Sequence, residues 1–184
     1  MPTLVSLNKK WIPISRPINT ILVPDGDEKE LPEGTELMVV HHQGGDYTLR
    51  SRLGRLYRVE GIDGDALGLE AAPAAGIEFK GPLSLDIIHD ILRTCYDPEI
   101  PVNLLDMGLI YDASFKQEDD KYDIDITMTL TAPGCGMGQV LVNDVQKKLA
   151  RLGMVRNVNV NLVFDPAWNP SMMTEAARLQ AGLM

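Results

Sequence analysis

Residues 122–138 read YDIDITMTLTAPGCGMG, and this stretch decides the fold of the C-terminal half of the chain. Its first part places apolar side chains at every second position, including Ile124, Ile126 and Met128, which is the pattern of a strand with one buried face. The Pro-Gly step at residues 133–134 ends this strand in a tight turn. The segment that follows repeats apolar residues every three or four positions, as an amphipathic helix does. We therefore predict a strand, a turn and a helix in direct succession.

The segments on either side extend this unit to an α-β-β-α-β order. Residues 83–96 have apolar positions at helical spacing, with Ser84 as a candidate N-cap. Residues 109–115 and 158–164 alternate as strands do, and a short C-terminal helix is expected from about residue 172 to residue 179. Two helices on one face of a sheet, with the other face left polar, make a two-layer α+β domain.

The N-terminal region differs in composition, since it is rich in proline and glycine and shows no helical periodicity longer than a turn. Short extended runs separated by turns favour a small all-β region, either a barrel or a sandwich. Its expected strands are residues 18–24, 36–42, 44–52 and 54–61. The Ala/Pro/Gly-rich segment of residues 70–82 is interpreted as a linker, so the predicted domains are residues 1–80 and 81–184.

The overall composition is that of a soluble globular protein, with 45% hydrophobic and 23% charged residues. No apolar run approaches the roughly 20 residues that span a bilayer, and no apolar stretch follows the basic residues near the N-terminus as in a secretory signal. Two cysteines are too few for a disulfide framework, so we expect a cytoplasmic protein. The net charge of −9 opposes binding to nucleic acid or a membrane surface, and we expect no cluster of basic residues against that sign.

Cys135 lies between two glycines in the turn before the predicted second helix. A thiol at a helix N-terminus has its pKa lowered from about 8.5 to roughly 3.5–7.5, and the glycines leave the sulfur uncovered. A small residue packed into a tight turn explains the same pattern, so the residues alone leave both interpretations open. Cys95 falls on the apolar side of its predicted helix and is expected to fill the core, where free cysteine is common.

Two further segments have unusual compositions. Residues 97–102, DPEIPV, combine the carboxylates of Asp97 and Glu99 with two prolines, which we interpret as a structural turn rather than an acid/base pair. Residues 165–173, DPAWNPSMM, place Trp168 in a rigid aromatic segment. Its tryptophan is equally typical of a protein interface and of a side chain that covers the core.

The histidines and the cysteine count limit the possible metal chemistry. His41 and His42 are neighbours in a predicted strand and point to opposite faces, while His89 lies at the edge of an apolar helix face. No C-x-x-C or H-E-x-x-H motif is present. One chain therefore lacks the four thiolates that usually hold an iron–sulfur cluster, and any cluster here is shared with another chain, incomplete or transient.

Three segments in the second region resemble the iron–sulfur cluster assembly domain family, which includes the SufT proteins of the bacterial SUF system, PaaD and eukaryotic cytosolic Fe–S targeting factors. They are DPEIPVNLLDMGLIYD (97–112), TMTLTAPGCGMG (127–138) and VFDPAWNPSMMTEAARLQAGL (163–183). The resemblance covers roughly residues 83–182. LPEGTELMVVHHQGGDYTL and IDGDALGLE resemble the N-terminal extension of stand-alone SufT proteins, which implies that residues 1–80 form a region of SufT type.

The resemblance also implies which residues form a site. Its cluster or thiol site groups four residues of two segments: Cys135, Asp97, Glu99 and Thr131. Trp168 and Pro166 match the aromatic segment of the family and would form an interaction surface. The chain departs from the pattern at Ala167, where many members have a second proline.

The function implied by the resemblance is that of a non-catalytic assembly or maturation factor of the SUF system, which aids cluster delivery to recipient proteins. The expected partners are SUF-type assembly proteins and apo Fe–S client proteins. A second copy of the chain is a further expected partner, because one functional cysteine per chain favours a site shared across a homodimer. No cofactor is expected to be tightly bound, and Cys135 would ligate iron only in a transient or inter-subunit Fe–S cluster. Two alternatives stay open: a thiol-dependent enzyme with Cys135 as nucleophile, and a protein-interaction module in which Cys135 is inert.

Overall fold

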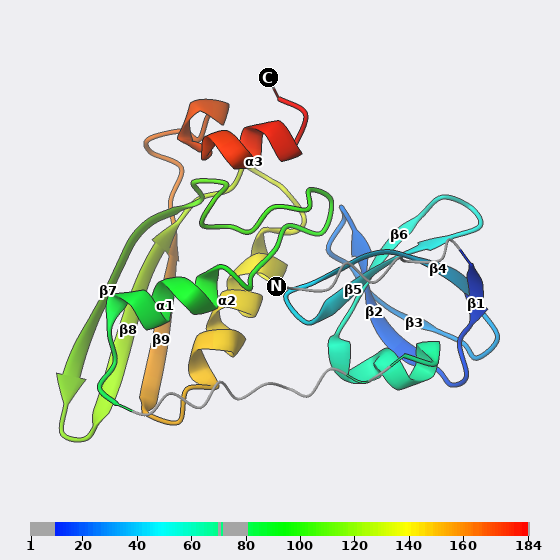
Figure 1. Ribbon diagram of the computed structural model, residues 1–184, viewed down its shortest axis with the longest axis horizontal. Coiled ribbons are helices and arrows are strands. Elements are labelled where there is room, and N and C mark those ends of the chain that lie inside the picture. Colours follow the sequence, from blue (N-terminus) through cyan, green and yellow to red (C-terminus); the bar gives the residue numbers. More distant parts are fainter. Residues whose placement is uncertain (1–9, 70, 72–80, 184) are drawn as a thin grey trace. The chain divides into compact units, whose positions relative to one another are not determined.

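The computed structural model describes residues 10–69, 71 and 81–183, and the chain divides into two compact units between Ala74 and Ala75 (Figure 1). Most of the segment interpreted as a linker, residues 70–82, lies outside the described residues. The interpretation of this segment as a linker therefore stays a prediction. The assignment of the N-terminal region to the SufT type also stays a prediction.

Unit 1 is a six-stranded antiparallel sheet in the order β1-β4-β5-β6-β2-β3, with one 3-10 helix, η1 (Gly61–Leu67). Its strands are β1 (Trp11–Pro13), β2 (Ile18–Val23), β3 (Glu28–Leu31), β4 (Glu36–Gln43), β5 (Asp46–Ser51) and β6 (Leu56–Val59). The four predicted strands are present, while β1 and β3 were missed because each has only three or four residues. The predicted all-β region is confirmed, and among the described residues its strands form a single sheet with β1 and β3 as the edge strands.

The core of unit 1 lies between this sheet and η1. Leu49 and Val59 are fully buried, and Ala66 and Leu67 of η1 belong to the same apolar cluster. The backbone N–H of Ser15 donates to the carbonyl of Ala66 at 2.9 Å, which holds η1 against the chain between β1 and β2. This short helix therefore covers one face of the sheet, in a region whose sequence shows no helical periodicity longer than a turn.

Unit 2 packs two helices on one face of a three-stranded sheet (Figure 1). In chain order its elements are α1 (Leu85–Leu92), β7 (Ile110–Glu118), β8 (Lys121–Met128), α2 (Gly138–Ala150) and β9 (Val155–Leu162). β7 is antiparallel to β8, and β9 is parallel to β8. The predicted α-β-β-α-β order is confirmed. The C-terminal segment forms η2 (Pro170–Met172) and α3 (Glu175–Gln180), so the predicted short C-terminal helix is confirmed as α3, which begins about three residues later than expected.

The alternation in β8 produces the core as predicted, since Ile124, Ile126 and Met128 are at most 1% exposed. These side chains pack in one apolar cluster with α1 and α2. At the polar face of the same strand, Asp125 accepts a hydrogen bond from Asn159 Nδ2 at 3.1 Å. The sheet is thus apolar toward the helices and polar on its other side.

Helix α1 begins where the sequence predicts, because the Ser84 hydroxyl accepts from the N–H of Ile87 at 3.3 Å. It ends at Leu92, however, several residues before the end of the segment with helical spacing, residues 83–96. Cys95 lies in the turn after the helix rather than on it, yet it is fully buried and its thiol contacts the carbonyl oxygen of Ile91 at 3.8 Å. Its predicted role as a core residue is confirmed, whereas its predicted place on the helix is wrong.

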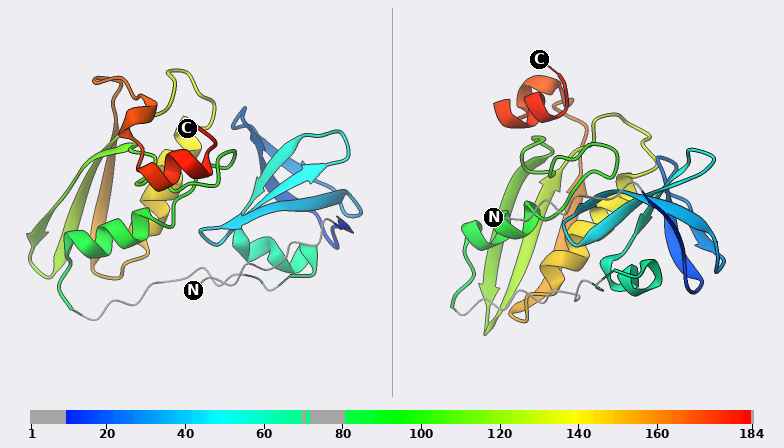
Figure 2. Two further views of the ribbon diagram at one scale, coloured as in Figure 1. Left: turned by 45° about the horizontal axis from the view of Figure 1, so that its top comes forward. Right: turned by 45° about the vertical axis from the view of Figure 1, so that its right-hand side comes forward.

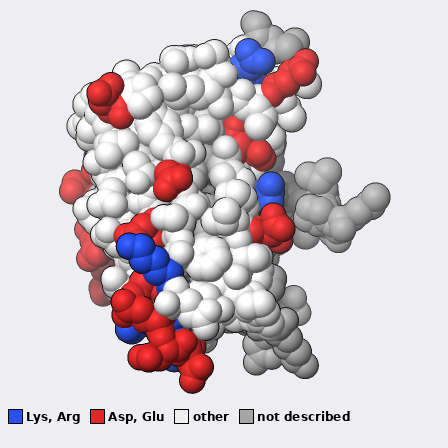
Figure 3. Space-filling view, turned by 90° about the vertical axis from the view of Figure 1, so that its left-hand side faces the viewer, with Lys and Arg blue, Asp and Glu red and all other residues white. Residues whose placement is uncertain are grey.

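Acidic side chains gather at the β7–β8 hairpin, toward the lower end of the view in Figure 3. Arg156 of β9 bridges this region, since its guanidinium bonds Glu118 at 2.7 Å and also pairs with both carboxylate oxygens of Asp123. The hydrogen bonds from Arg156 hold the pKa of Asp123 below its usual value. One arginine therefore fastens the start of β9 to both strands of the hairpin.

Replacing Arg156 by alanine is expected to raise the pKa of Asp123 toward its usual value near 4, because the charged form loses its partner. Since the pKa is depressed in the folded state, the ion pair stabilises the fold above the ordinary carboxyl pKa. That contribution is lost as the pH falls through the depressed value. NMR titration of the Asp123 carboxyl group measures the change, and Arg151→Ala on the exposed end of α2 is the control. Equal Asp123 titration curves in all three proteins would contradict the assignment.

Candidate functional site at one edge of the unit 2 sheet

The register of the sheet brings the three segments that resemble the family to the same end of the strands, which we call the site edge of the sheet. Ile110 at the start of β7 pairs with Met128 at the end of β8, which pairs with Leu162 at the end of β9. The loop into β7 and the loops out of β8 and β9 therefore meet there, as both views of Figure 2 show. These loops are residues 96–109, 129–137 and 163–169. The sequence could not show this meeting because the loops are up to 73 residues apart along the chain.

Cys135 lies in the loop from β8 to α2, at the border between the core and the surface. Its side chain is partly buried and packs against the apolar cluster, while Thr131, Gly134 and Gly136 of the same loop are exposed. α2 begins three residues later, at Gly138, whose N–H donates to the carbonyl oxygen of Cys135 at 3.0 Å. The thiol therefore lies in the turn three residues before α2 and not at the helix start itself. Its side chain faces the core on one side and solvent on the other.

Asp97 stabilises a turn of its own loop. Its Oδ1 accepts from the N–H of Glu99 at 2.8 Å and from the N–H of Ile100 at 3.0 Å. The structural turn expected for this segment is therefore present, and the Glu99 side chain is exposed beyond it. Within the part of the chain that the structure describes, no hydrogen bond joins Asp97, Glu99 or Thr131 to Cys135. The fold brings these predicted site residues to one end of the sheet, without a hydrogen bond from any of them to the thiol.

Trp168 ties the segment after β9 to the loop before β7. Its indole Nε1–H donates to the carbonyl oxygen of Met107 at 2.8 Å, and its ring is partly buried against the core. The Tyr111 hydroxyl donates to the carbonyl oxygen of Pro166 at 2.7 Å, and Pro166 itself is exposed. The structure therefore shows Trp168 as a cover for the core, and the interaction surface assigned to Trp168 and Pro166 stays a prediction.

The structure also reveals a contact that sequence reasoning missed. Gly108 has a φ of +69°, and a Cβ atom there would lie 2.3 Å from the carbonyl oxygen of Met172. The N–H of Thr174 donates to the carbonyl oxygen of Asp106 at 2.9 Å, next to this approach. The only sequence signal was a glycine after DM in the first segment, and nothing in the pattern names Met172 as its partner.

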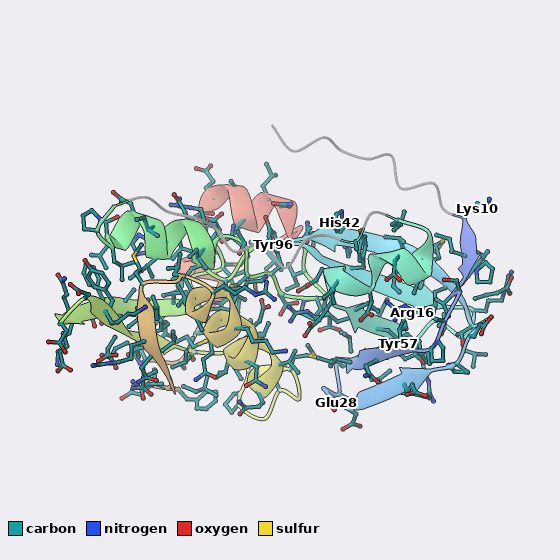
Figure 4. All side chains as sticks on the ribbon, turned by 90° about the horizontal axis from the view of Figure 1, so that it is seen from below. Lys10, Arg16, Glu28, His42, Tyr57 and Tyr96 are labelled. Atoms are coloured by element: carbon teal, nitrogen blue, oxygen red, sulfur yellow. The ribbon has the colours of Figure 1, made fainter. Side chains whose placement is uncertain are left out.

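The histidines lie on elements of both units. His42 lies on β4 of unit 1 (Figure 4), where its ring stacks on Tyr47 with centroids 4.2 Å apart. His89 lies in the last turn of α1. Among the described residues, no histidine hydrogen-bonds Cys135, and no three His, Cys, Asp or Glu side chains gather to hold a metal ion. In the same residues, no helix is long and apolar enough to cross a membrane.

Comparison with known proteins gives matches in this half of the chain. Residues 85–162 match the model of a family described as iron–sulfur cluster assembly protein. A relative from Porphyromonas gingivalis named Fe-S protein maturation auxiliary factor is 42% identical over 99 residues, which cover 54% of this chain and 90% of the relative. YitW of Bacillus subtilis, with the same description, is 34% identical over 52% of this chain and 91% of its own. SufT of Staphylococcus aureus, described likewise, is 32% identical over 47% and 96%.

These matches cover most of each relative but only part of this chain. Each alignment takes in at least nine tenths of the relative but only about half of this chain. The matched family model lies entirely within unit 2 and contains Cys135, Asp97, Glu99 and Thr131. The sheet of unit 1 lies outside that model, so it adds a part that the family match does not explain.

Proposed function

This chain belongs to the iron–sulfur cluster assembly protein family, as its three segments predicted, and we propose that it is an auxiliary factor in the maturation of iron–sulfur proteins. The alignment with nearly the full length of three relatives that bear that description carries the proposal. The factor acts without catalysis, in the cytoplasm, and the cluster is its cargo. Its partners are assembly proteins of the SUF type and the apo client proteins that receive clusters.

Cys135 is the thiol that supports this role. Iron–sulfur clusters are held by cysteine thiolates, and Cys135 has a side chain only partly buried, whereas Cys95 is fully buried. One thiolate does not complete the usual set of four cluster ligands. The cluster is therefore shared for a short time between Cys135 and ligands of a second chain, which is either another copy of this protein or the client.

The surroundings of Cys135 suit the approach of another chain. Leu162 and Phe164, at the end of β9 and just beyond it, are 37% and 42% exposed although they continue the apolar alternation of that strand. They lie at the same sheet edge as the loop that carries Cys135. Exposed apolar side chains beside polar loops are typical of surfaces that a protein partner covers.

A thiol enzyme is less well supported. A nucleophilic cysteine needs a general base at hydrogen-bond distance. Among the described residues, no hydrogen bond joins the sulfur of Cys135 to a histidine or a carboxylate. A thiol with no positioned base suits a ligand that is passed between proteins better than a nucleophile.

Deletion of the gene that encodes this chain, in its native cells, tests the proposal. Under iron limitation, we expect the activity of an enzyme that depends on a [4Fe–4S] cluster to fall, because apo protein accumulates. An enzyme without a cluster is the control and should keep its activity. Unchanged activity of both enzymes would contradict a role in maturation. Anaerobic reconstitution of the purified chain with iron and sulfide, followed by native mass spectrometry, then distinguishes a cluster shared in a homodimer from one that needs the client.

A further inference from the structure

The turn that joins β5 to β6 in unit 1 exposes a large apolar side chain. Leu53 is 88% exposed, which is the largest value for any large hydrophobic residue that the structure describes. We call residues 50–55, RSRLGR, the arginine hairpin. A single exposed leucine is common on protein surfaces, so its meaning depends on what surrounds it.

The hairpin holds Leu53 in a defined position. The N–H of Ser51 donates to the carbonyl oxygen of Arg55, and the N–H of Gly54 donates to that of Ser51, both at 2.9 Å. The guanidinium of Arg52 lies over the Trp11 ring, 4.5 Å from its centroid, and pairs with Glu36 at 2.5 Å. Leu53 is therefore presented at the tip of an ordered turn, which reduces the entropy lost when a partner binds it.

Positive charge accompanies this leucine. Arg50, Arg52, Arg55 and Arg58 lie within nine residues, and no acidic residue occurs between Asp46 and Glu60. Arg58 is buried and pairs with Asp46 at 2.6 Å. Arg50 and Arg55 are exposed, and the described residues offer neither of them an ion pair. The expectation that no basic cluster opposes the acidic character of the chain is therefore wrong at this hairpin.

We propose that the arginine hairpin is a docking site for a protein that presents an apolar pocket ringed by carboxylates. Leu53 would enter the pocket, where burial removes its apolar surface from water. Arg50 and Arg55 would pair with carboxylates at the rim, where arginine forms two parallel hydrogen bonds. A buried apolar anchor with a polar rim is the usual composition of a specific interface.

The charges of unit 1 favour a protein over a membrane or a nucleic acid. Residues 10–69 contain ten acidic and seven basic side chains, so an extended anionic surface would be repelled outside the hairpin. Single-stranded nucleic acid is bound by aromatic rings on which bases stack, and the arginine hairpin has none. A pocket on a protein needs to match the charges of the hairpin only locally.

This inference goes beyond the proposed function and does not depend on Cys135. The hairpin belongs to unit 1, whereas the family model matches residues 85–162 of unit 2. Unit 1 would thus determine which partner protein binds to this chain, through a contact that does not involve Cys135.

Site-specific photo-crosslinking of the full chain in its native cells is the first test. A photoreactive phenylalanine analogue at position 53 is expected to link to one protein, through a peptide rich in Asp and Glu. The same analogue at Ile62, which is 58% exposed on η1, is the matched control and should not form that adduct. No protein adduct at position 53, or an adduct with a phospholipid or nucleic acid, would overturn the proposal.

Binding of the purified partner to variants of the full chain is the second test. Leu53→Ser is expected to raise the dissociation constant by about tenfold or more. The double variant Arg50→Glu with Arg55→Glu is expected to raise it by a similar factor. Ile62→Ser and Lys29→Glu are the matched apolar and charge controls and should leave it unchanged. Arg52 is not altered because it anchors the turn through Trp11 and Glu36. Equal affinities for all variants would contradict the docking site. Cys135→Ala is expected to bind the partner as the original chain does, because the contact is separate from the thiol, and loss of binding by that variant would also contradict the docking site.

Discussion

Cys135→Ala is expected to abolish cluster delivery while leaving the fold intact. The substitution removes the one thiol that lies at the edge where three loops of unit 2 meet, so no ligand remains to receive or pass on iron. Because the side chain is only partly buried, the free energy of unfolding should change by less than about 1 kcal/mol. Activity of a [4Fe–4S] enzyme in deletion cells carrying the variant measures delivery, and thermal unfolding of the purified variant measures stability.

Cys95→Ala is the matched control, since it removes the same atom from a different environment. Cys95 is fully buried, so this variant should lose stability, on the order of 1 kcal/mol, because a small cavity opens in the core. Its folded molecules should deliver clusters as the original protein does. Full delivery by Cys135→Ala would contradict the thiol role and would favour an interaction module in which this cysteine is inert.

Gly108→Ala is expected to cause a large loss of stability in unit 2. The φ of +69° alone costs an L-residue roughly 1–2 kcal/mol. The added Cβ would also lie 2.3 Å from the carbonyl oxygen of Met172, which is backbone and has little freedom to move aside. The C-terminal segment should therefore detach, with loss of the hydrogen bond from Trp168 to Met107. We expect a total cost of about 3 kcal/mol or more.

Gly134→Ala separates the two causes of that loss. Gly134 has a φ of +80°, yet a Cβ atom there would meet nothing within 4 Å. This variant should therefore show only the conformational cost, about 1–2 kcal/mol. Thermal unfolding measures both variants, and hydrogen exchange of residues 166–180 reports whether the C-terminal segment has detached. Equal stability losses, with unchanged exchange in that segment, would show that the contact between Gly108 and Met172 has little importance.

Local patterns in the sequence predicted much of unit 2 correctly. The alternation of β8 and the spacing of α1 follow from one buried face, and burial of that face is visible in the order of apolar residues. Short elements were harder, because β1 and β3 are too brief to show any period. Exposure within an element was also hard to predict, because Leu85 is an apolar residue at the first position of α1 and is nevertheless 44% exposed.

The candidate site shows the same division. Resemblance of three segments identified the family and drew attention to Cys135, and the comparisons confirm the family. The sequence also anticipated that Asp97 would stabilise a turn. It did not reveal that Trp168 covers the core, that Gly108 meets Met172, or that Leu53 is exposed at the arginine hairpin. Each of these facts depends on which side chains remain exposed or which distant segments come close.

The sequence by itself determined the order of elements in unit 2, the family and the single available thiol. These follow from local periodicity and from motifs whose residues are close along the chain. Only the tertiary structure decided that residues 96–109, 129–137 and 163–169 meet at one end of the sheet, because that requires the antiparallel and parallel pairings of β8 to be known. The same holds for the exposure of Leu53, which depends on where a turn ends and not on its composition. A pattern in sequence records what a residue is, whereas burial and proximity depend on the whole chain.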